Sequence, residues 1–226
     1  MNEVASPIVS RRLALKFEVA ALVSLHVSSI ARGLMGLTAR SRRLEIYYWP
    51  ETLVSVFSGA GGLLIVLFVI WSSGDKLESF GIRKWRWNID PAYALLAFSV
   101  MFAIHLVYSS NLYGTYNLFG SYRTPAGLSK SYVLGVPLYL MVGFREELFF
   151  RGYLIARFQE LFKEQVYSPI IVSAGIFALV HLTYGPPYAL TVFAAGLAFG
   201  FLYRQTKSIL PLALAHAVFD YLIIYT

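Results

Sequence analysis

The feature that most constrains this chain is a cluster of charges inside an apolar run, residues 143–152. Glu146, Glu147 and Arg151 stand there among glycine, leucine and phenylalanine residues. On insertion scales, a charged side chain at the centre of a bilayer costs roughly 2.5–3.5 kcal/mol. Charges inside a membrane usually face the interior of a helix bundle and mark a functional site. We therefore expect a polar site enclosed by apolar helices.

The composition identifies the class of protein. Of the 226 residues, 58% are hydrophobic and only 14% are charged, whereas soluble domains average about 45–50% apolar and about 25% charged residues. We predict an all-α fold, a polytopic transmembrane helical bundle that crosses the cell membrane about six or seven times. No linker divides the chain, so residues 1–226 should form a single membrane-embedded domain.

Charge and cysteine content exclude several function classes. The net charge of +7 fits loops that retain Lys and Arg on the cytoplasmic side of a membrane. Nucleic-acid binding would need a basic patch on a soluble scaffold, so no nucleic-acid partner is expected. The absence of cysteine excludes disulfides, thiolate metal sites and a catalytic thiol.

Apolar segments suitable for helices follow one another along most of the chain. Segment 13–37 also holds Lys16, Glu18 and His26, so it is either a first span or an interfacial helix. A polar loop is expected at 109–130. The remaining segments that we expect to be helical are 52–71, 91–108, 131–162, 169–182, 188–203 and 210–225.

The basic stretches constrain the orientation of these segments. If every segment from residue 52 onward spans the membrane, the stretches at 72–90, 151–167 and 204–207 lie on one side, which should be cytoplasmic. The arginines within 40–43 would then lie on the opposite side, against the rule. The sequence leaves this conflict open.

Spacings of four residues place polar groups on common helix faces. Glu147 and Arg151 are four residues apart, so we expect them to pair and to brace the helix. Glu146 is rotated by about 100° from Glu147. Since adjacent residues do not face each other on a helix, we expect Arg145 to leave Glu146 without a full counter-charge. Such a carboxylate suits a general base that takes a proton from water.

Two later segments carry histidines at the same spacing. His181 follows Phe177 by four residues, and His216 precedes Asp220 by four. The second pair allows a carboxylate to orient an imidazole. An ionised aspartate cannot donate a hydrogen bond, so Asp220 is either protonated, bound to a metal or placed to orient His216, and we favour the last. Facing helices of a bundle can together supply one site.

These residues resemble the motifs of the CPBP family, the CAAX-protease and bacteriocin-processing (Abi) membrane proteins, which include the type II CAAX prenyl endopeptidases. The resemblance covers about residues 131–226, the predicted protease core. The motifs E-E-x-x-x-R, F-x-x-x-H and H-x-x-x-N/D stand here as Glu146-Glu147 with Arg151, Phe177 with His181, and His216 with Asp220.

The resemblance implies an intramembrane endopeptidase. Its substrate would be a membrane-associated peptide or protein, lipidated ones included, with membrane lipid as a further partner. Glu146, helped by His181, would activate water for attack on a peptide bond. The other members of the implied catalytic set would stabilise the oxyanion (His216 and Asp220) or hold the scaffold (Glu147 and Arg151).

The resemblance also leaves a metal open, since family members have been described as metalloproteases. The candidate ligands are Glu146, His181 and His216, and two histidines with one glutamate form a catalytic zinc set. The H-E-x-x-H spacing is absent. No cofactor is therefore predicted with certainty, and the glutamate and divalent-metal mechanisms stay as alternatives.

Two other functions compete with proteolysis. A non-catalytic membrane binding, immunity or scaffold protein of the same fold would have no need for Glu146. A transporter would also place Glu and His inside the membrane, but its expected sign, an inverted repeat, is not visible in this short chain.

Overall fold

The computed structural model describes residues 7–26, 30, 34, 49–111, 132–163 and 165–225. Within these ranges all regular structure is helical and no strand occurs, which confirms the all-α prediction. The arginines within 40–43 and most of the loop expected at 109–130 lie outside the described residues, as does much of segment 13–37.

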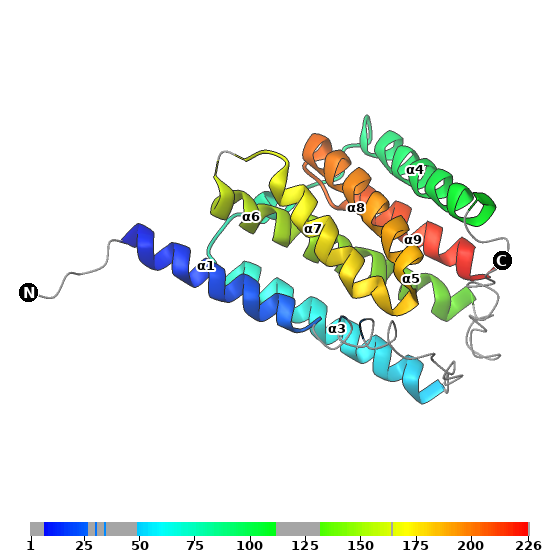
Figure 1. Ribbon diagram of the computed structural model, residues 1–226, viewed down its shortest axis with the longest axis horizontal. Coiled ribbons are helices and arrows are strands. Elements are labelled where there is room, and N and C mark those ends of the chain that lie inside the picture. Colours follow the sequence, from blue (N-terminus) through cyan, green and yellow to red (C-terminus); the bar gives the residue numbers. More distant parts are fainter. Residues whose placement is uncertain are drawn as a thin grey trace, which may run out of the picture.

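From residue 49 onward the long helices agree with the expected apolar segments, whereas α1 begins at Pro7, before the expected segment 13–37 (Figure 1). The expected single helix at 131–162 is one continuous helical run in three parts: α5, a π-helical stretch η2, and α6. The 3₁₀ turn η1 precedes α4, and the 3₁₀ turn η3 follows α7. The bounds are α1 (Pro7–Ser24), α3 (Trp49–Ser72), η1 (Leu77–Phe80), α4 (Asp90–Asn111), α5 (Tyr132–Glu147), η2 (Leu148–Leu154), α6 (Ile155–Phe162), α7 (Ser168–Val180), η3 (His181–Tyr184), α8 (Pro186–Thr206) and α9 (Leu210–Tyr225).

The α5–η2–α6 run lies in the middle of the bundle. α5 packs on α9, α7 packs on α8, and α4 packs on both α8 and α9. α1 contacts α6, and α3 contacts α5 and η2. Figure 1 shows α4, α8 and α9 above the central helices and α1 with α3 below them. The α5–η2–α6 run therefore has other helices on several sides.

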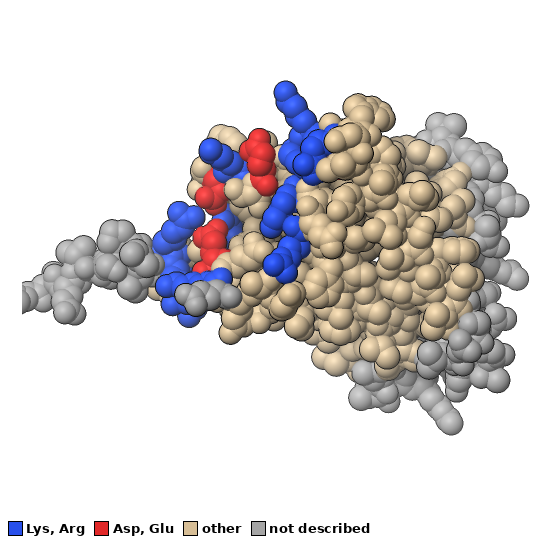
Figure 2. Space-filling model, turned by 90° about the horizontal axis from the view of Figure 1, so that it is seen from above, with Lys and Arg blue, Asp and Glu red and all other residues tan. Residues whose placement is uncertain are grey.

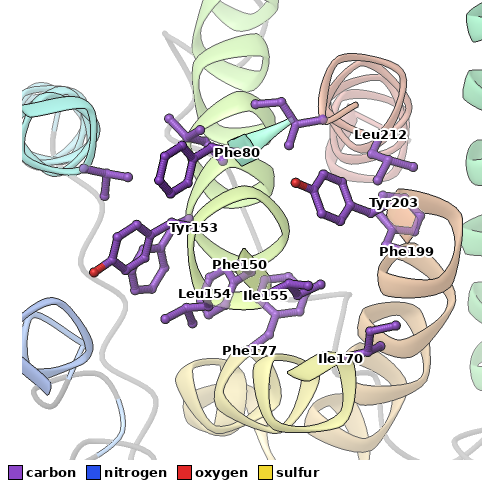
Figure 3. Close-up of a cluster of buried hydrophobic side chains, with 14 of the residues drawn as sticks. Phe80, Phe150, Tyr153, Leu154, Ile155, Ile170, Phe177, Phe199, Tyr203 and Leu212 are labelled. Carbon is purple, nitrogen blue, oxygen red and sulfur yellow. The ribbon is translucent and has the colours of Figure 1, made fainter. Parts of the chain in front are cut away.

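The π-helical stretch η2 forms the centre of the hydrophobic core (Figure 3). All of its residues, Leu148 to Leu154, are buried. The Ser173 hydroxyl on α7 donates a hydrogen bond to the Phe150 carbonyl oxygen, 2.6 Å away. A wider helix presents side chains at angles that a regular α-helix does not reach, and such segments frequently occur at functional sites. Here η2 begins directly after Glu147.

Small residues allow α7 and α8 to pack closely. A Cβ added to Gly196 would lie 3.0 Å from the Ala174 Cβ, and one added to Gly200 would clash with Ile170. The G-x-x-x-G spacing of α8 is therefore a helix-packing face. This contact sets the position of α7, which carries Phe177 and leads into His181.

The helix boundaries refine two expected segments. The expected helix at 169–182 ends at Val180, and His181 begins the 3₁₀ turn η3. α8 begins at Pro186, two residues before the expected start at 188, because Gly185 turns the chain with φ 101° and proline suits the first helical position. His181 therefore lies at a helix end, between α7 and η3.

Two helices of the described part are long and apolar enough to cross a membrane, over Asp90–Tyr108 and Pro186–Thr206. Shorter apolar helices occur at Ala60–Ser72, Ser168–Tyr184 and Leu210–Leu222. Length and composition of this kind are also found in core helices of soluble proteins. The six or seven spans expected from the sequence stay a prediction.

Charged side chains gather in one band near one end of the molecule, on the face shown in Figure 2. Hydrogen bonds join the basic stretches there: Arg83 and Arg86 both donate to the Thr206 carbonyl oxygen, at 3.2 and 3.1 Å. Arg157 reaches Asp75 at 2.7 Å. The stretches 72–90, 151–167 and 204–207 thus meet at one end, as expected.

Candidate active site

A buried trio of side chains joins the first and third motifs. Glu147 accepts a hydrogen bond from Arg151 Nη1 at 2.8 Å, which is the ion pair expected from their spacing. The same carboxylate oxygen of Glu147 lies 2.8 Å from His216 Nδ1 on α9. The exposed fractions are 0% for Glu147, 2% for Arg151 and 6% for His216. Glu147 therefore fixes the ring of His216 as well as the helix surface.

The orientation of His216 differs from the expectation. Glu147, and not Asp220, is the carboxylate bonded to Nδ1. The opposite nitrogen, Nε2, lies 3.5 Å from Asp220 Oδ2 and 3.9 Å from Glu146 Oε2. The spacing of four residues did bring Asp220 to the ring, but a carboxylate distant in sequence occupies the orienting position. Nε2 is thus the nitrogen directed at the remaining acids of the site.

Aromatic rings enclose the Arg151 guanidinium. Its Cζ lies 4.5 Å from the ring centre of Phe177 and 5.3 Å from that of Phe199. His216 contacts the same two rings edge-on, with centroid distances of 6.3 and 6.2 Å. A cation over an aromatic face is stabilised where water is excluded. Phe177 of the F-x-x-x-H motif therefore contacts both Arg151 of the E-E-x-x-x-R motif and His216 of the H-x-x-x-N/D motif.

Glu146 has a cationic partner, contrary to expectation. Arg145 Nη2 lies 2.9 Å from Glu146 Oε1, because the long arginine side chain can bend back toward its neighbour. The side chains are 30% and 15% exposed, respectively. This pair is therefore less enclosed than the Glu147–Arg151 pair. The second oxygen of Glu146 faces His216 Nε2.

The position of His181 leaves one ring nitrogen free for chemistry. Its Nδ1 lies 2.8 Å from the Phe177 carbonyl oxygen. A carbonyl can only accept, so Nδ1 carries the proton, and Nε2 of the neutral ring holds a lone pair. The ring of His181 packs edge-on against Phe177, with a centroid distance of 4.6 Å. Phe177 therefore contacts both His181 and His216.

The structure thus brings the sequence-predicted residues into one region. Contacts of 2.8–3.9 Å connect five of them: Glu146, Glu147, Arg151, His216 and Asp220. His181 joins them through the ring of Phe177. The catalytic roles expected of the six residues stay predictions.

His26 lies nearer to this region than the sequence indicated. Its ring stacks on Phe149 at 4.8 Å and contacts Phe150 edge-on at 5.8 Å. It is also within electrostatic range of Glu146 and His181. The sequence did not single out His26 as a site residue, because it belongs to none of the motifs. No pattern in the sequence places the end of α1 beside η2.

The candidate metal ligands do not form a metal site. Among the residues that the structure describes, no group of three or more His, Cys, Asp or Glu side chains is placed to hold a metal ion. Glu146 is bonded to Arg145, and His216 directs Nδ1 to Glu147. A cationic guanidinium beside a ligand carboxylate competes with a divalent cation. We derive no reaction step through a metal.

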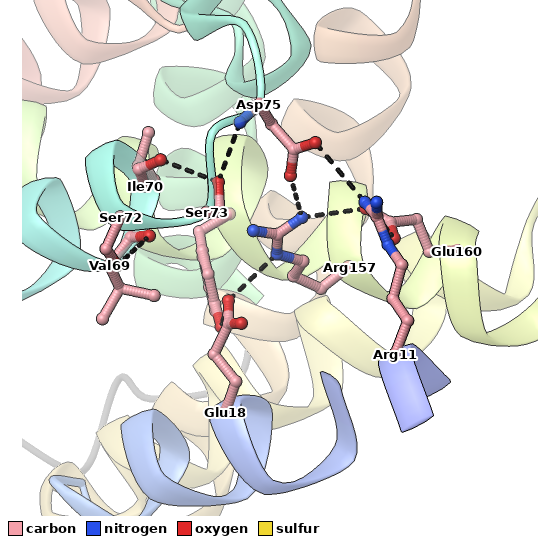
Figure 4. Close-up of polar contacts among 10 residues, drawn as sticks. Arg11, Glu18, Val69, Ile70, Ser72, Ser73, Asp75, Arg157 and Glu160 are labelled. Atoms are coloured by element: carbon pink, nitrogen blue, oxygen red, sulfur yellow. Dashed lines mark hydrogen bonds and ion pairs between the residues drawn. The ribbon is translucent and has the colours of Figure 1, made fainter. Parts of the chain in front are cut away.

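A second ion cluster lies at the charged end of the bundle (Figure 4). Arg157 donates to Glu18 at 3.1 Å, to Asp75 at 2.7 Å and to Glu160 at 2.8 Å. Burial alone would raise the pKa of Asp75, but the hydrogen bond and charge of Arg157 outweigh it and hold this pKa below its usual value. The cluster joins α1, the loop after α3, and α6.

Comparison with known proteins bears on the motif-bearing part of the chain. Residues 128–222 match the family model described as Type II CAAX prenyl endopeptidase Rce1-like. The resemblance expected from the motifs is confirmed over this range. The matched family consists of membrane-embedded endopeptidases that act on membrane-associated proteins. No curated protein and no solved structure gives a significant match.

Proposed function

We propose that this chain is a multi-pass intramembrane endopeptidase that hydrolyses a peptide bond of a membrane-associated, lipidated protein. The observation that carries the proposal is the approach of Glu146 and Asp220 to His216 Nε2, within 3.9 and 3.5 Å. This group lies inside the segment that matches a CAAX endopeptidase model. Polar groups that converge in an apolar bundle define a candidate reaction centre.

Glu146 is the proposed general base. It is the less enclosed of the two glutamates, and its Oε2 is not used by Arg145, which contacts Oε1. Oε2 takes a proton from water as the water oxygen bonds to the substrate carbonyl carbon. The same proton passes to the leaving amine when the C–N bond breaks, so the carboxylate is regenerated.

The two histidines have different proposed roles. His181 holds a lone pair on Nε2, so it can accept a hydrogen bond from the attacking water and orient it. His216 carries its proton on Nε2 when it is an imidazolium, and this N–H can donate to the oxyanion. Three carboxylates, of Glu146, Glu147 and Asp220, face two guanidinium groups at the site. A proton on His216 makes this set of side chains neutral.

The location in a membrane is supported by the outer surface of the helices. Only 11% of the apolar window in α4 is buried, which is not the situation of a soluble core helix. Leu95 is 67% exposed and Val107 is 56% exposed on this helix. Exposed apolar surface of this extent is solvated by lipid at low cost. The charged band at one end would lie at the cytoplasmic interface.

The test is cleavage of membrane-tethered peptides by purified protein in liposomes. Peptides with and without a prenylated C-terminal cysteine are compared, each with and without a chelator. Wild type should cleave, Glu146→Gln should lower kcat by roughly 10²–10⁴-fold, and His181→Ala should also lose activity. Glu78→Gln, at an exposed glutamate of η1, is the matched control and should behave as wild type.

Each outcome has a defined meaning. Cleavage that survives in Glu146→Gln would contradict the proposed base. Chelator-sensitive cleavage would favour the metal alternative over the glutamate mechanism. If folded wild type cleaves none of the peptides and Glu146→Gln still rescues a cellular phenotype, the chain is a binding or scaffold protein.

A further inference from the structure

The proposed reaction needs a hydrogen-bond donor that the three motifs do not fully supply. When water attacks the peptide carbonyl, its oxygen becomes an oxyanion, which several donors usually stabilise together. His216 offers one N–H through Nε2. Asp220 stands where the related motif also permits asparagine, and an ionised aspartate can only accept. A neutral donor is therefore missing from the motif residues.

We propose that Tyr188 supplies this donor, and that its hydroxyl group binds the oxyanion together with His216. The inference rests on the proposed endopeptidase function. Tyr188 lies in the first turn of α8, and its ring centre is 6.2 Å from that of His181. Its phenol is within electrostatic range of the Asp220 and Glu146 carboxylates. Tyr188 therefore lies close to the residues that we propose to take part in the reaction.

Neighbouring rings fix the position of Tyr188. Tyr184 packs edge-on against it with a centroid distance of 5.2 Å, and Tyr108 of α4 does so at 6.1 Å. Gly185, with φ 101°, and the two prolines after it set the start of α8. A ring held on two sides keeps its hydroxyl group in place before the reaction, and donors fixed in this way are the effective ones.

Tyr188 is suited to donation by its chemistry. An ordinary phenol has a pKa of about 10, so it carries its proton at neutral pH. The hydroxyl therefore carries a proton that it can donate, whereas an ionised carboxylate can only accept.

The step balances without another reactant. Water gives a proton to Glu146 while its oxygen bonds to the carbonyl carbon, and the carbonyl electron pair moves to the substrate oxygen. That oxyanion accepts hydrogen bonds from Tyr188 O–H and His216 Nε2–H. When the oxyanion collapses, the C–N bond breaks, and Glu146 transfers the proton that came from water to the leaving amine. Tyr188 keeps its own proton throughout.

The test compares Tyr188→Phe with Tyr184→Phe in the liposome assay. Tyr184 is a matched control because its ring is also close to His181, at 6.0 Å, but it is 39% exposed. Tyr188→Phe should lower kcat by roughly 10²–10³-fold with KM changed by less than about threefold. Tyr184→Phe should keep wild-type kcat. Both should melt at the wild-type temperature.

A second readout separates an oxyanion donor from a residue that only positions Asp220. A phosphonamidate peptide, which imitates the tetrahedral intermediate, should lose affinity in Tyr188→Phe by the same factor as kcat, while substrate affinity stays. In an Asp220→Asn background, where residue 220 can donate, Tyr188→Phe should cost less than in wild type.

Several results would overturn the inference. One is wild-type kcat in Tyr188→Phe; another is an equal loss in Tyr184→Phe; a third is an unchanged affinity for the phosphonamidate. Wild type that cleaves no peptide defeats the proposed function itself, and the Tyr188 assignment with it. Cleavage by wild type with an unaffected Tyr188→Phe defeats the Tyr188 assignment alone.

Discussion

Arg151 and Arg157 are six residues apart on one continuous helical run, and each is only 2% exposed, yet their surroundings differ. Arg157 bonds three carboxylates from three parts of the chain: Glu18, Asp75 and Glu160. Arg151 bonds one carboxylate and otherwise lies against aromatic rings. Arg157 therefore has three carboxylate partners, whereas Arg151 has one.

The same helical run carries a structural ion cluster at Arg157 and the candidate active site around Arg151. The Arg157 cluster uses its charges among themselves and joins three elements. Around Arg151, Glu147 shares one oxygen between two partners, and its other oxygen, Oε2, is buried without a hydrogen bond to any residue of the described part. His216 Nε2 and Glu146 Oε2 also face each other at a distance longer than a hydrogen bond. Such unused polar capacity is expensive in a core and is typical of reaction centres.

The largest effect should come from removing Arg151. Arg151→Met leaves the Glu147 carboxylate buried without its cation, and breaking a buried pair in this way costs about 3–5 kcal/mol. The loss should appear in unfolding titrations in detergent micelles. Any protein that stays folded should cleave more slowly, since the Glu147 carboxylate that orients His216 has lost its cation. Wild-type stability in Arg151→Met would show that the pair is not the brace we describe.

A smaller loss of stability is expected from removing Arg157. Arg157→Met removes three charge-assisted hydrogen bonds, but their carboxylates are 25–34% exposed and can turn to water. We expect a loss of about 1.5–3 kcal/mol in the same unfolding titration. Cleavage per folded molecule should match wild type. A selective loss of kcat in Arg157→Met would contradict the purely structural role that we assign to Arg157.

Acid should weaken the Arg157 cluster through Asp75. Its pKa in the folded protein is lower than usual, despite the opposing effect of burial, because Arg157 favours the carboxylate. This stability is present above the ordinary aspartate pKa of about 3.9 and is lost as pH falls from there through the lower folded value. The slope of stability against pH in this range should be shallower in Asp75→Asn. An identical slope in the two proteins would contradict the assignment.

The smallest effect should occur at the rim of the cluster. Arg11 is paired with Asp75 and Glu160 at 3.4 Å each, and its side chain is 62% exposed. Exposed pairs of this kind contribute about 0.2–1 kcal/mol and are screened by salt. Arg11→Ala should therefore barely change the unfolding midpoint, and added salt should remove even that difference. A loss as large as that of Arg157→Met would mean that the rim pairs hold the cluster.

Much of the fold could be predicted from the sequence, because apolar runs bounded by Gly, Pro and charges indicate helices directly. The spacing of Glu147 and Arg151 predicted their ion pair, since both lie on one helix. The number of membrane spans was not confirmed, because several helices are short or interrupted. The π-helical stretch η2 has no recognised sequence signal, and it changes which side chains point inward.

The sequence predicted which residues gather at the site, but it did not predict which of them bond to one another. Helical spacing brought Asp220 near His216, but the carboxylate on His216 Nδ1 is Glu147, from a helix far away in the sequence. The Arg145–Glu146 contact depends on a side-chain rotamer, which spacing does not determine. Tyr188 and His26 belong to no motif, so only tertiary packing places them beside the site.

The central claim is that Glu146 performs the chemistry while Glu147 and Arg151 hold the site. The most direct measurement is kcat for cleavage of a membrane-tethered prenylated peptide by wild type, Glu146→Gln and Glu78→Gln, with the unfolding midpoint of each protein. We predict that Glu146→Gln loses kcat by roughly 10²–10⁴-fold and unfolds at the wild-type midpoint, and that Glu78→Gln matches wild type in both. Wild-type kcat in a well-folded Glu146→Gln protein would contradict the account.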